Sequence, residues 1–142
     1  MHLRVGPGGA VRCGGGHNHR FGLHDAVMLK DNHLVATGSI TAAVAAVRAA
    51  VGHLVVVQLE VDHLGQIPEA LAAGVDVILL DNMGPEVLRE AVELIGGRAV
   101  TEASGGITLA GAHDIAASGV DVISVGWITL SVPRLDVALD LT

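Results

Sequence analysis

Residues 75–97 have the sequence "VDVILLDNMGPEVLREAVELIGG", which combines two secondary-structure patterns in one stretch. Its first part, "VDVILLD", is a short run of valine, isoleucine and leucine, which is typical of a buried strand. Its second part, "PEVLREAVELIGG", predicts a helix with Pro85 near the start, where proline is tolerated. A strand that leads directly into a helix is one βα unit, and repetition of this unit predicts a parallel sheet.

The same alternation continues on both sides of this stretch. Further strands are predicted at 26–31, 53–61, 98–106 and 120–126, the third of them running into a loop. Further helices are predicted at 39–52, 68–74, 108–119 and 133–141. The residues predicted to begin or end these helices are Ser39, Gly52, Pro68, Gly74, Thr108 and Gly119.

The predicted units recur about every 20–30 residues, which is the size of one βαβ step. A complete (β/α)₈ barrel needs about 250 residues, whereas this chain has 142. The fold class is therefore α/β, either a small open sheet or part of a barrel. Hydrophobic residues make up 51% of the chain but aromatic residues only 1%, which favours small helix–sheet contacts over a sandwich built on large rings.

Composition also limits the possible partners and location. The formal net charge of -7 argues against nonspecific binding of nucleic acid. The longest apolar tract, 40–57, is interrupted by Arg48, Gly52 and His53, so we expect no membrane span. Residues 1–9 have no apolar signal-peptide core. Cys13 is the single cysteine, which excludes an intrachain disulfide and fits a reducing, cytoplasmic location.

Most of the predicted strands end in a polar residue or in glycine. The residues at or near these ends are Lys30, Glu60, Asp81, Glu102, Ser104 and Gly126. Any one carboxylate there could simply cap a helix or face solvent. Because the carboxyl ends of parallel strands meet at one edge of a sheet, the set together predicts a site at that edge.

Two glycine-containing stretches suit anionic ligands. The sequence "SGGIT" (104–108) exposes backbone N–H groups that suit a phosphate. The sequence "GGGHNHRFGLHDAVMLKDNH" (14–33) gathers cationic and cationisable side chains in an otherwise acidic chain. A metal site formed by His17 and His19 lacks a third ligand at clear spacing, so we predict no metal-ligating residues.

Several motifs resemble, in order and spacing, the C-terminal half of quinolinate phosphoribosyltransferase, also called carboxylating nicotinate-nucleotide pyrophosphorylase. The most specific is "AVRCGGGHNHRFGLHDAVMLKDNH" (10–33), followed by "LEVD", "VILLDNM", "EASGGIT", "GVDVISVGWIT" and "LDVALD". The resemblance implies an incomplete α/β barrel of about five parallel βα units over 17–142, after a glycine-rich lead-in at 1–16. It also implies that the family's separate N-terminal domain is lacking from these residues.

The resemblance further implies transfer of phosphoribose from 5-phosphoribosyl-1-pyrophosphate to the ring nitrogen of quinolinate. The products are nicotinate mononucleotide, carbon dioxide and pyrophosphate, and Mg²⁺ accompanies the pyrophosphate. By motif, His19, Arg20 and Lys30 are implied to bind the carboxylates of quinolinate. Glu60 and Asp81 are implied to lie near the ribose hydroxyls. Lys30, Glu60 and Asp81 form the implied catalytic set. The implied 5′-phosphate cradle consists of Ser104, Gly105, Gly106 and Gly126.

The chain departs from the family pattern at several places. Residues 1–9 contain no "RKT-x-PG" segment, whose Arg and Lys help to bind substrate in the family. Trp127 stands where a small residue is usual, and Leu130 where a histidine is usual. We therefore expect these residues to be inactive on their own. The resemblance also implies a homo-oligomer, which the full-length family forms.

Three alternatives remain open at this point. The chain could be a noncatalytic, phosphate-binding remnant, or a paralogous transferase that acts on another aromatic acid. Lys30 could also form a Schiff base, as the lysine of a barrel aldolase does, although its neighbours "KDNH" fit the transferase better.

Overall fold

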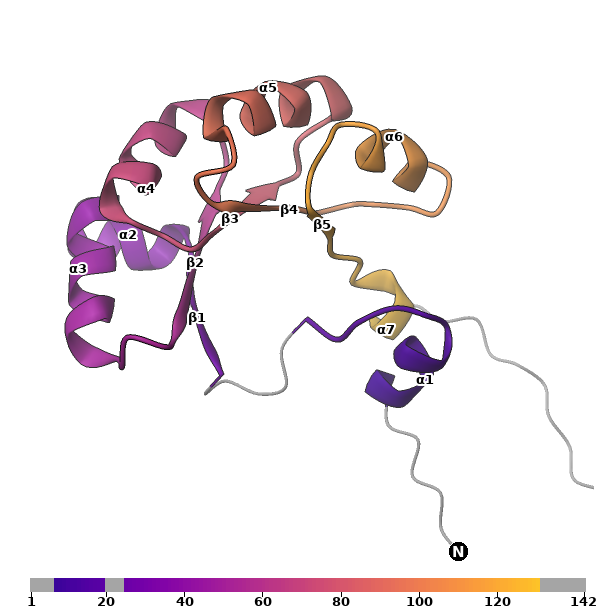
Figure 1. Ribbon diagram of the computed structural model, residues 1–142, viewed down its shortest axis with the longest axis horizontal. Helices are drawn as coiled ribbons and strands as arrows, with labels where there is room; N and C mark the ends of the chain where they lie inside the picture. Colours follow the sequence, from indigo (N-terminus) through magenta and orange to yellow (C-terminus); the bar gives the residue numbers. More distant parts are fainter. Residues whose placement is uncertain (1–6, 20–24, 131–142) are drawn as a thin grey trace, which may run out of the picture.

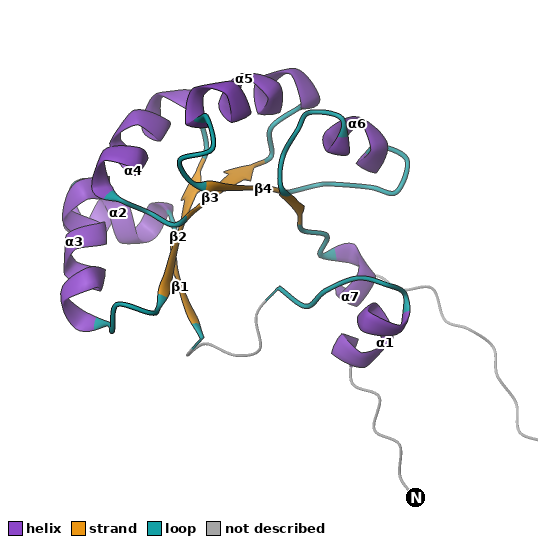
Figure 2. Cartoon of the chain, in the orientation of Figure 1, coloured by secondary structure: helices purple, strands orange, loops and turns teal. Residues whose placement is uncertain are grey.

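The computed structural model describes residues 7–19 and 25–130. These residues form one curved sheet of five parallel strands in the order β1-β2-β3-β4-β5, with helices along its convex side (Figures 1 and 2). The strands are β1 (Ala26–Leu29), β2 (Val56–Val61), β3 (Val77–Asp81), β4 (Val100–Ser104) and β5 (Val122–Ile123). The predicted incomplete barrel of about five parallel βα units is confirmed.

The first helix precedes the first strand, and the other helices follow strands along the chain. They are α1 (Pro7–Cys13), α2 (Asp31–Thr37), α3 (Ile40–Ala50), η1 (Leu64–Gln66), α4 (Ile67–Ala73), α5 (Pro85–Ile95), α6 (Ala112–Ala116) and α7 (Trp127–Leu130). Among the described residues no single helix is long and apolar enough to cross a membrane. Helices α2 and α3 pass that test of length and composition only as a pair, which is bent by 93°.

Local chemistry explains where the central helices begin and end. The Ser39 hydroxyl accepts a hydrogen bond from the backbone N–H of Ala42 at 3.1 Å, as an N-cap does. Pro68 and Pro85 lie in the first turns of α4 and α5. Gly74 ends α4 with a φ of 76°, a backbone conformation that costs glycine little. These predicted boundaries are confirmed.

The two faces of the sheet differ in chemistry. Side chains alternate along a strand, and one set packs under the helices to form the core. Fully buried members of this core include Val57, Leu59, Val61, Ile78, Leu80, Leu88 and Ile95. The other set faces the concave side and is largely polar on β2 and β4. The interior of the partial barrel therefore presents polar groups to a ligand.

A short motif, "GVDV", occurs before both β3 and β5 and joins neighbouring strands. The Asp76 carboxylate accepts a hydrogen bond from the Val57 N–H at 2.7 Å. The Asp121 carboxylate accepts from the Thr101 N–H at 2.8 Å and from the Thr101 hydroxyl at 2.7 Å. Each aspartate thus holds the start of its own strand beside the start of the preceding strand.

We expect Asp121→Asn to lower the free energy of unfolding by about 1 kcal/mol at neutral pH, because the bonds to Thr101 are charge-assisted but only partly buried. These hydrogen bonds, led by the one from the Thr101 backbone, lower the pKa of Asp121. The folded pKa lies below the unfolded one, so the stabilisation is full above about pH 4 and is lost as the pH falls through the folded pKa. Urea unfolding of both proteins between neutral and acidic pH measures the difference. The exposed Asp114 of α6 is the matched control, and an Asp114→Asn change of equal size would contradict the assignment.

Several predicted elements differ from the structure. The helix predicted at 108–119 is reduced to α6, because residues 109–111 and 117–119 form turns; the Thr108 hydroxyl still accepts from the Gly111 N–H at 3.3 Å, as an N-cap would. Strand β5 is shorter than the predicted 120–126. Helix α1 lies inside the predicted glycine-rich lead-in, and α2 and α7 were not predicted. The helix predicted at 133–141 falls outside the described residues.

Candidate active site

The carboxyl ends of the strands bring most of the predicted site residues to one edge of the sheet. Lys30 follows β1 directly, Glu60 lies near the end of β2, and Asp81 and Ser104 end β3 and β4. Asp81 and Ser104 are register partners on adjacent strands. Gly126 follows β5 and lines a pocket with Ser104. The predicted placement on one edge is therefore confirmed for these residues.

Lys30 forms an ion pair with Glu60 across the first two strands. The Lys30 Nζ donates a hydrogen bond to Glu60 Oε2 at 2.8 Å. This bond, with the negative charges of Glu60, Asp81 and Asp31, raises the pKa of the Lys30 amine. Lys30 is therefore a cation at neutral pH, which suits carboxylate binding. A Schiff base requires a neutral amine, so the geometry does not favour the aldolase alternative.

Carboxylates converge beside this ion pair. Oxygen atoms of Glu60, Asp62 and Asp81 lie within 4.8 Å of one another, and the Asn82 amide donates to Asp81 Oδ2 at 2.6 Å. Such a set of oxygen donors fits a hard cation such as Mg²⁺. Asp62 was quoted within a motif but not predicted as a site residue. The signal was available, because Gln58 and Glu60 alternate along an otherwise apolar strand and Asp62 continues the same spacing just after its end.

The glycine turn after β4 packs tightly against the turn after β3. Gly105 and Gly106 have φ values of +86° and +59°, and the Asn82 N–H donates to the Ser104 carbonyl at 2.9 Å. A Cβ atom on Gly105 would overlap Asn82 Oδ1 and lie 2.8 Å from the Asn82 backbone nitrogen. Only glycine fits there, and the backbone N–H groups of such a turn suit an anion.

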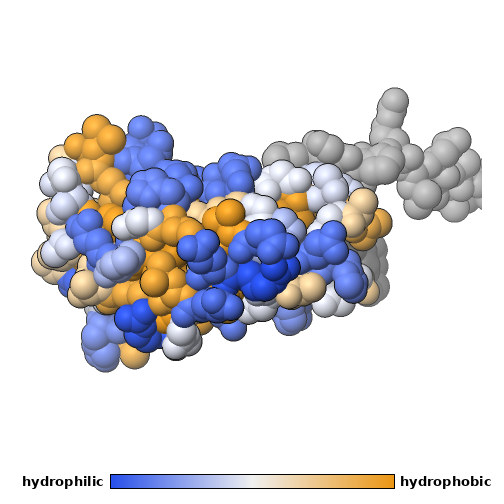
Figure 3. Space-filling view, turned by 90° about the horizontal axis from the view of Figure 1, so that it is seen from above, coloured by the Kyte–Doolittle hydropathy of each residue, from blue (hydrophilic) through white to orange (hydrophobic). Residues whose placement is uncertain are grey.

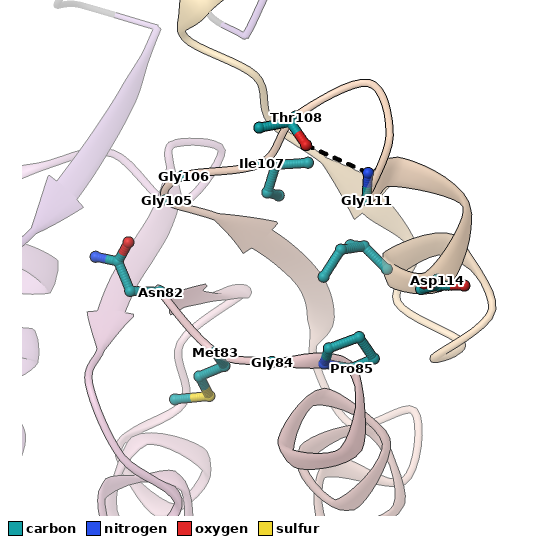
Figure 4. Close-up of a pocket in the computed structure, with 11 residues that line it drawn as sticks. Asn82, Met83, Gly84, Pro85, Gly105, Gly106, Ile107, Thr108, Gly111 and Asp114 are labelled. Atoms are coloured by element: carbon teal, nitrogen blue, oxygen red, sulfur yellow. Dashed lines mark hydrogen bonds between the residues drawn. The ribbon is translucent and has the colours of Figure 1, made fainter.

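Two hollows adjoin this glycine turn. One, of about 660 Å³, is lined by Ser104, Gly105, Gly106, Ile107, Thr108, Leu109, Ser124, Gly126 and Trp127. The other, of about 410 Å³, lies between the turns that follow β3 and β4, with Asn82 and Pro85 on one side and Thr108 and Asp114 on the other (Figure 4). All the residues of the predicted phosphate cradle line the larger hollow, and Trp127 lines it too.

His19 approaches the polar face of the sheet from the segment before β1. Its Nε2 lies 3.1 Å from Glu102 Oε1, and the residue Glu102 is only 5% exposed. The Gln58 amide donates to Glu102 Oε2 at 2.6 Å, and the Ser124 hydroxyl donates to Glu102 Oε1. Arg20, the neighbouring predicted ligand, lies outside the described residues.

Glu102, Gln58 and Ser124 were missed as members of the site. Glu102 was noted at a strand end, but its buried position among donors from other elements was not foreseen. The available signal was period two, because Gln58 precedes Glu60 by two residues and Glu102 precedes Ser104 by two. The partners are far apart in sequence, which is why spacing alone could not pair them.

The fold and the site define an incomplete α/β barrel with a polar, glycine-lined site at the carboxyl ends of its strands. The family model described as "Quinolinate phosphoribosyl transferase, C-terminal domain" matches residues 2–140. The chain belongs to this family.

Named relatives agree with this assignment. A probable carboxylating nicotinate-nucleotide pyrophosphorylase of Bacillus subtilis is 48% identical over 133 residues, covering 94% of this chain and 46% of the relative. The carboxylating nicotinate-nucleotide pyrophosphorylase of Mycobacterium leprae is 47% identical, covering 93% and 47%. A crystal structure of a NadC deletion mutant has a TM-score of 0.88 and 45% identity, covering 95% and 48%. The chain thus spans about half the length of these relatives.

Proposed function

We propose that these residues form the phosphoribosyl-transfer site of a carboxylating nicotinate-nucleotide pyrophosphorylase. The ring nitrogen of quinolinate attacks C1 of the ribose of 5-phosphoribosyl-1-pyrophosphate, and pyrophosphate leaves with the electron pair of the broken C–O bond. The adjacent carboxylate then leaves as carbon dioxide, and a proton takes its place. The observation that carries the proposal is one sheet edge that holds the Lys30–Glu60 ion pair, a carboxylate cluster and a glycine-lined pocket.

The proposed quinolinate site uses the cationic residues near β1. A dicarboxylate needs several converging cations, and the planar guanidinium of an arginine can hold one carboxylate with two bonds. We assign this role to Arg20, together with His19 and Lys30. The Lys30 ammonium is already oriented by Glu60, so it loses little freedom when quinolinate binds.

The proposed ribose site uses Glu60 and Asp81. Carboxylates can accept hydrogen bonds from the ribose hydroxyls, and their charge stabilises an oxocarbenium-like ribose in the transition state. Glu60, Asp62 and Asp81 could hold the Mg²⁺ that enters with the pyrophosphate, where the ion neutralises charge on the leaving group. Lys30 competes for Glu60, which leaves Asp62 and Asp81 as the better donors to a cation.

The proposed 5′-phosphate site is the larger hollow at the glycine turn. Backbone N–H groups of a glycine-rich turn suit phosphate oxygens, and the Ser104 hydroxyl adds a donor. Trp127 lines this hollow and is 39% exposed. Its bulky ring beside the proposed phosphate would misplace the ribose for transfer, which favours the second candidate, a phosphate-binding remnant without turnover. A transferase for another aromatic acid differs from both by its choice of acceptor.

We also propose a homo-oligomer and a cytoplasmic location. Large hydrophobic side chains reach the surface between hydrophilic ones (Figure 3), and Val35 and Leu54 are 84% and 86% exposed. Apolar surface left exposed in this way supports the proposal of an interface with another chain. The free, exposed Cys13 fits a compartment that keeps thiols reduced.

A chimera tests the proposed activity. The half of the Bacillus subtilis relative that this chain does not match would be joined to these 142 residues. Purified chimera, quinolinate, 5-phosphoribosyl-1-pyrophosphate and Mg²⁺ should then give nicotinate mononucleotide. Turnover of a different aromatic acid would support the paralogous transferase, and phosphate binding without product would support the remnant.

In that chimera we expect Arg20→Ala to weaken quinolinate binding by about tenfold or more, since one charge-assisted contact contributes about 1.5–3 kcal/mol. Binding of 5-phosphoribosyl-1-pyrophosphate should change much less. Calorimetry with each ligand measures the two effects. Arg89 is a matched control, because it lies on α5 and pairs with Glu86, so Arg89→Ala should affect neither ligand. Equal losses of affinity for both ligands would contradict the assignment of Arg20 to the quinolinate site.

A further inference from the structure

Glu102 is a buried carboxylate to which the proposed reaction gives no role. It lies on β4, on the concave face, in the same row of the sheet as Glu60, since both are register partners of Leu79. Its exposed fraction is 5%. A buried charge costs free energy unless hydrogen bonds compensate it, so its surroundings should show why it is there.

Groups from three separate segments converge on this carboxylate. Gln58 of β2 donates to Oε2 at 2.6 Å, and Ser124, just after β5, donates to Oε1. His19, from the segment before β1, places Nε2 3.1 Å from Oε1. Hydrogen-bond donors on both oxygens are what an ionised carboxylate in the interior requires.

We propose that Glu102 is a positioning residue that fixes the His19 ring for binding a substrate carboxylate and ties it to the phosphate pocket through Ser124. This inference rests on the proposed function, because that function assigns His19 to quinolinate. Glu102 itself touches no reacting atom in this scheme.

The consequence for His19 follows from the chemistry of the ring. An ionised carboxylate only accepts hydrogen bonds, so the His19 nitrogen that faces it, Nε2, carries a hydrogen. The other nitrogen, Nδ1, is then the one that meets a ligand, and it donates to a carboxylate when the ring is a cation. A carboxylate behind a histidine sets ring orientation in the same way at metal sites.

The consequence for the pocket follows from Ser124. Ser124 lines the larger hollow with Ser104 and Gly126, and it shares the Oε1 atom of Glu102 with His19. One carboxylate oxygen therefore sets the separation between the end of the site that holds quinolinate and the end that holds the phosphate. The distance between two bound substrates controls the rate of their reaction.

The first test needs no substrate. The 142-residue chain, labelled with ¹⁵N-histidine, should give an NMR signal from His19 with a protonated Nε2. Glu102→Gln should shift this signal, because an amide can turn its NH₂ group toward the ring. Glu93, an exposed residue of α5, supplies the control, and Glu93→Gln should leave the His19 signal in place. A His19 signal that Glu102→Gln does not move would overturn the proposal.

The second test separates positioning from stability, with kinetics in the chimera. Glu102→Gln should raise the KM for quinolinate by about tenfold, the loss expected for one well-oriented charge-assisted contact. The KM for 5-phosphoribosyl-1-pyrophosphate should change less, and the circular dichroism spectrum should be unchanged. Equal loss for both substrates with a lower melting temperature would show a merely structural role and refute the proposal. An inactive chimera whose His19 signal still responds to Glu102→Gln would support the contact and count against the proposed function instead.

Discussion

The 142 residues on their own should form nicotinate mononucleotide at least about a thousandfold more slowly than the chimera. The described site is open to water, because the Lys30 side chain is 50% exposed. Phosphoribosyl transfer develops charge that fixed groups stabilise well only when water is excluded. Each lost donor to developing charge lowers the rate by about a hundredfold or more. The loss of one donor together with the misplacement of another group therefore gives the expected thousandfold difference in rate.

The same residues should self-associate. In the described part of the chain, β1 and β5 form the edges of the sheet, and unpaired strand edges invite pairing with another chain. The measurements are the mass in solution and an assay for nicotinate mononucleotide with Mg²⁺, with a Lys30→Met chimera as the background reference. A monodisperse monomer that turns over at the rate of the chimera would contradict both expectations.

The strands and the sheet edge were predictable from the sequence because their signals are local. Runs such as "VILLD" and "VVVQLEV" have one interpretation once helices separate them, and parallel topology then places Lys30, Glu60, Asp81 and Ser104 together. The capping of α3 by Ser39 and of α4 by Gly74 has the same local origin. Nothing beyond neighbouring residues was needed for either inference.

The remaining features depend on particular turns and side-chain hydrogen bonds, some local and some between distant residues. Helix α2 begins where the His33 ring accepts the Lys30 N–H at 2.9 Å, an arrangement that composition does not reveal. Gln58 and Glu102 are 44 residues apart, so their pairing requires the sheet register. The predicted helix at 108–119 is shortened because residues 109–111 and 117–119 form turns on either side of α6.

Gly105→Ala should lower the free energy of unfolding by about 2–5 kcal/mol. This cost is the sum of two terms, the left-handed backbone conformation of a non-glycine residue and overpacking against a neighbour. Gly105 has a φ of +86°, and the new Cβ would lie 2.8 Å from the Asn82 backbone nitrogen. Backbone cannot move aside as a flexible side chain can. Relief of the clash would therefore break the bond from the Asn82 N–H to the Ser104 carbonyl and separate the turns that follow β3 and β4.

Gly38→Ala is the matched control for this prediction. Gly38 has nearly the same φ, +84°, but a Cβ there would meet nothing within 4 Å, so it should cost only about 1–2 kcal/mol. Urea unfolding measures both, followed by circular dichroism and by the fluorescence of Trp127, the single tryptophan of the chain. The difference between the two variants isolates the contact with Asn82. If Gly105→Ala cost no more than Gly38→Ala, the turn could yield without penalty, and the larger hollow would lack the rigid wall that a preformed phosphate site requires.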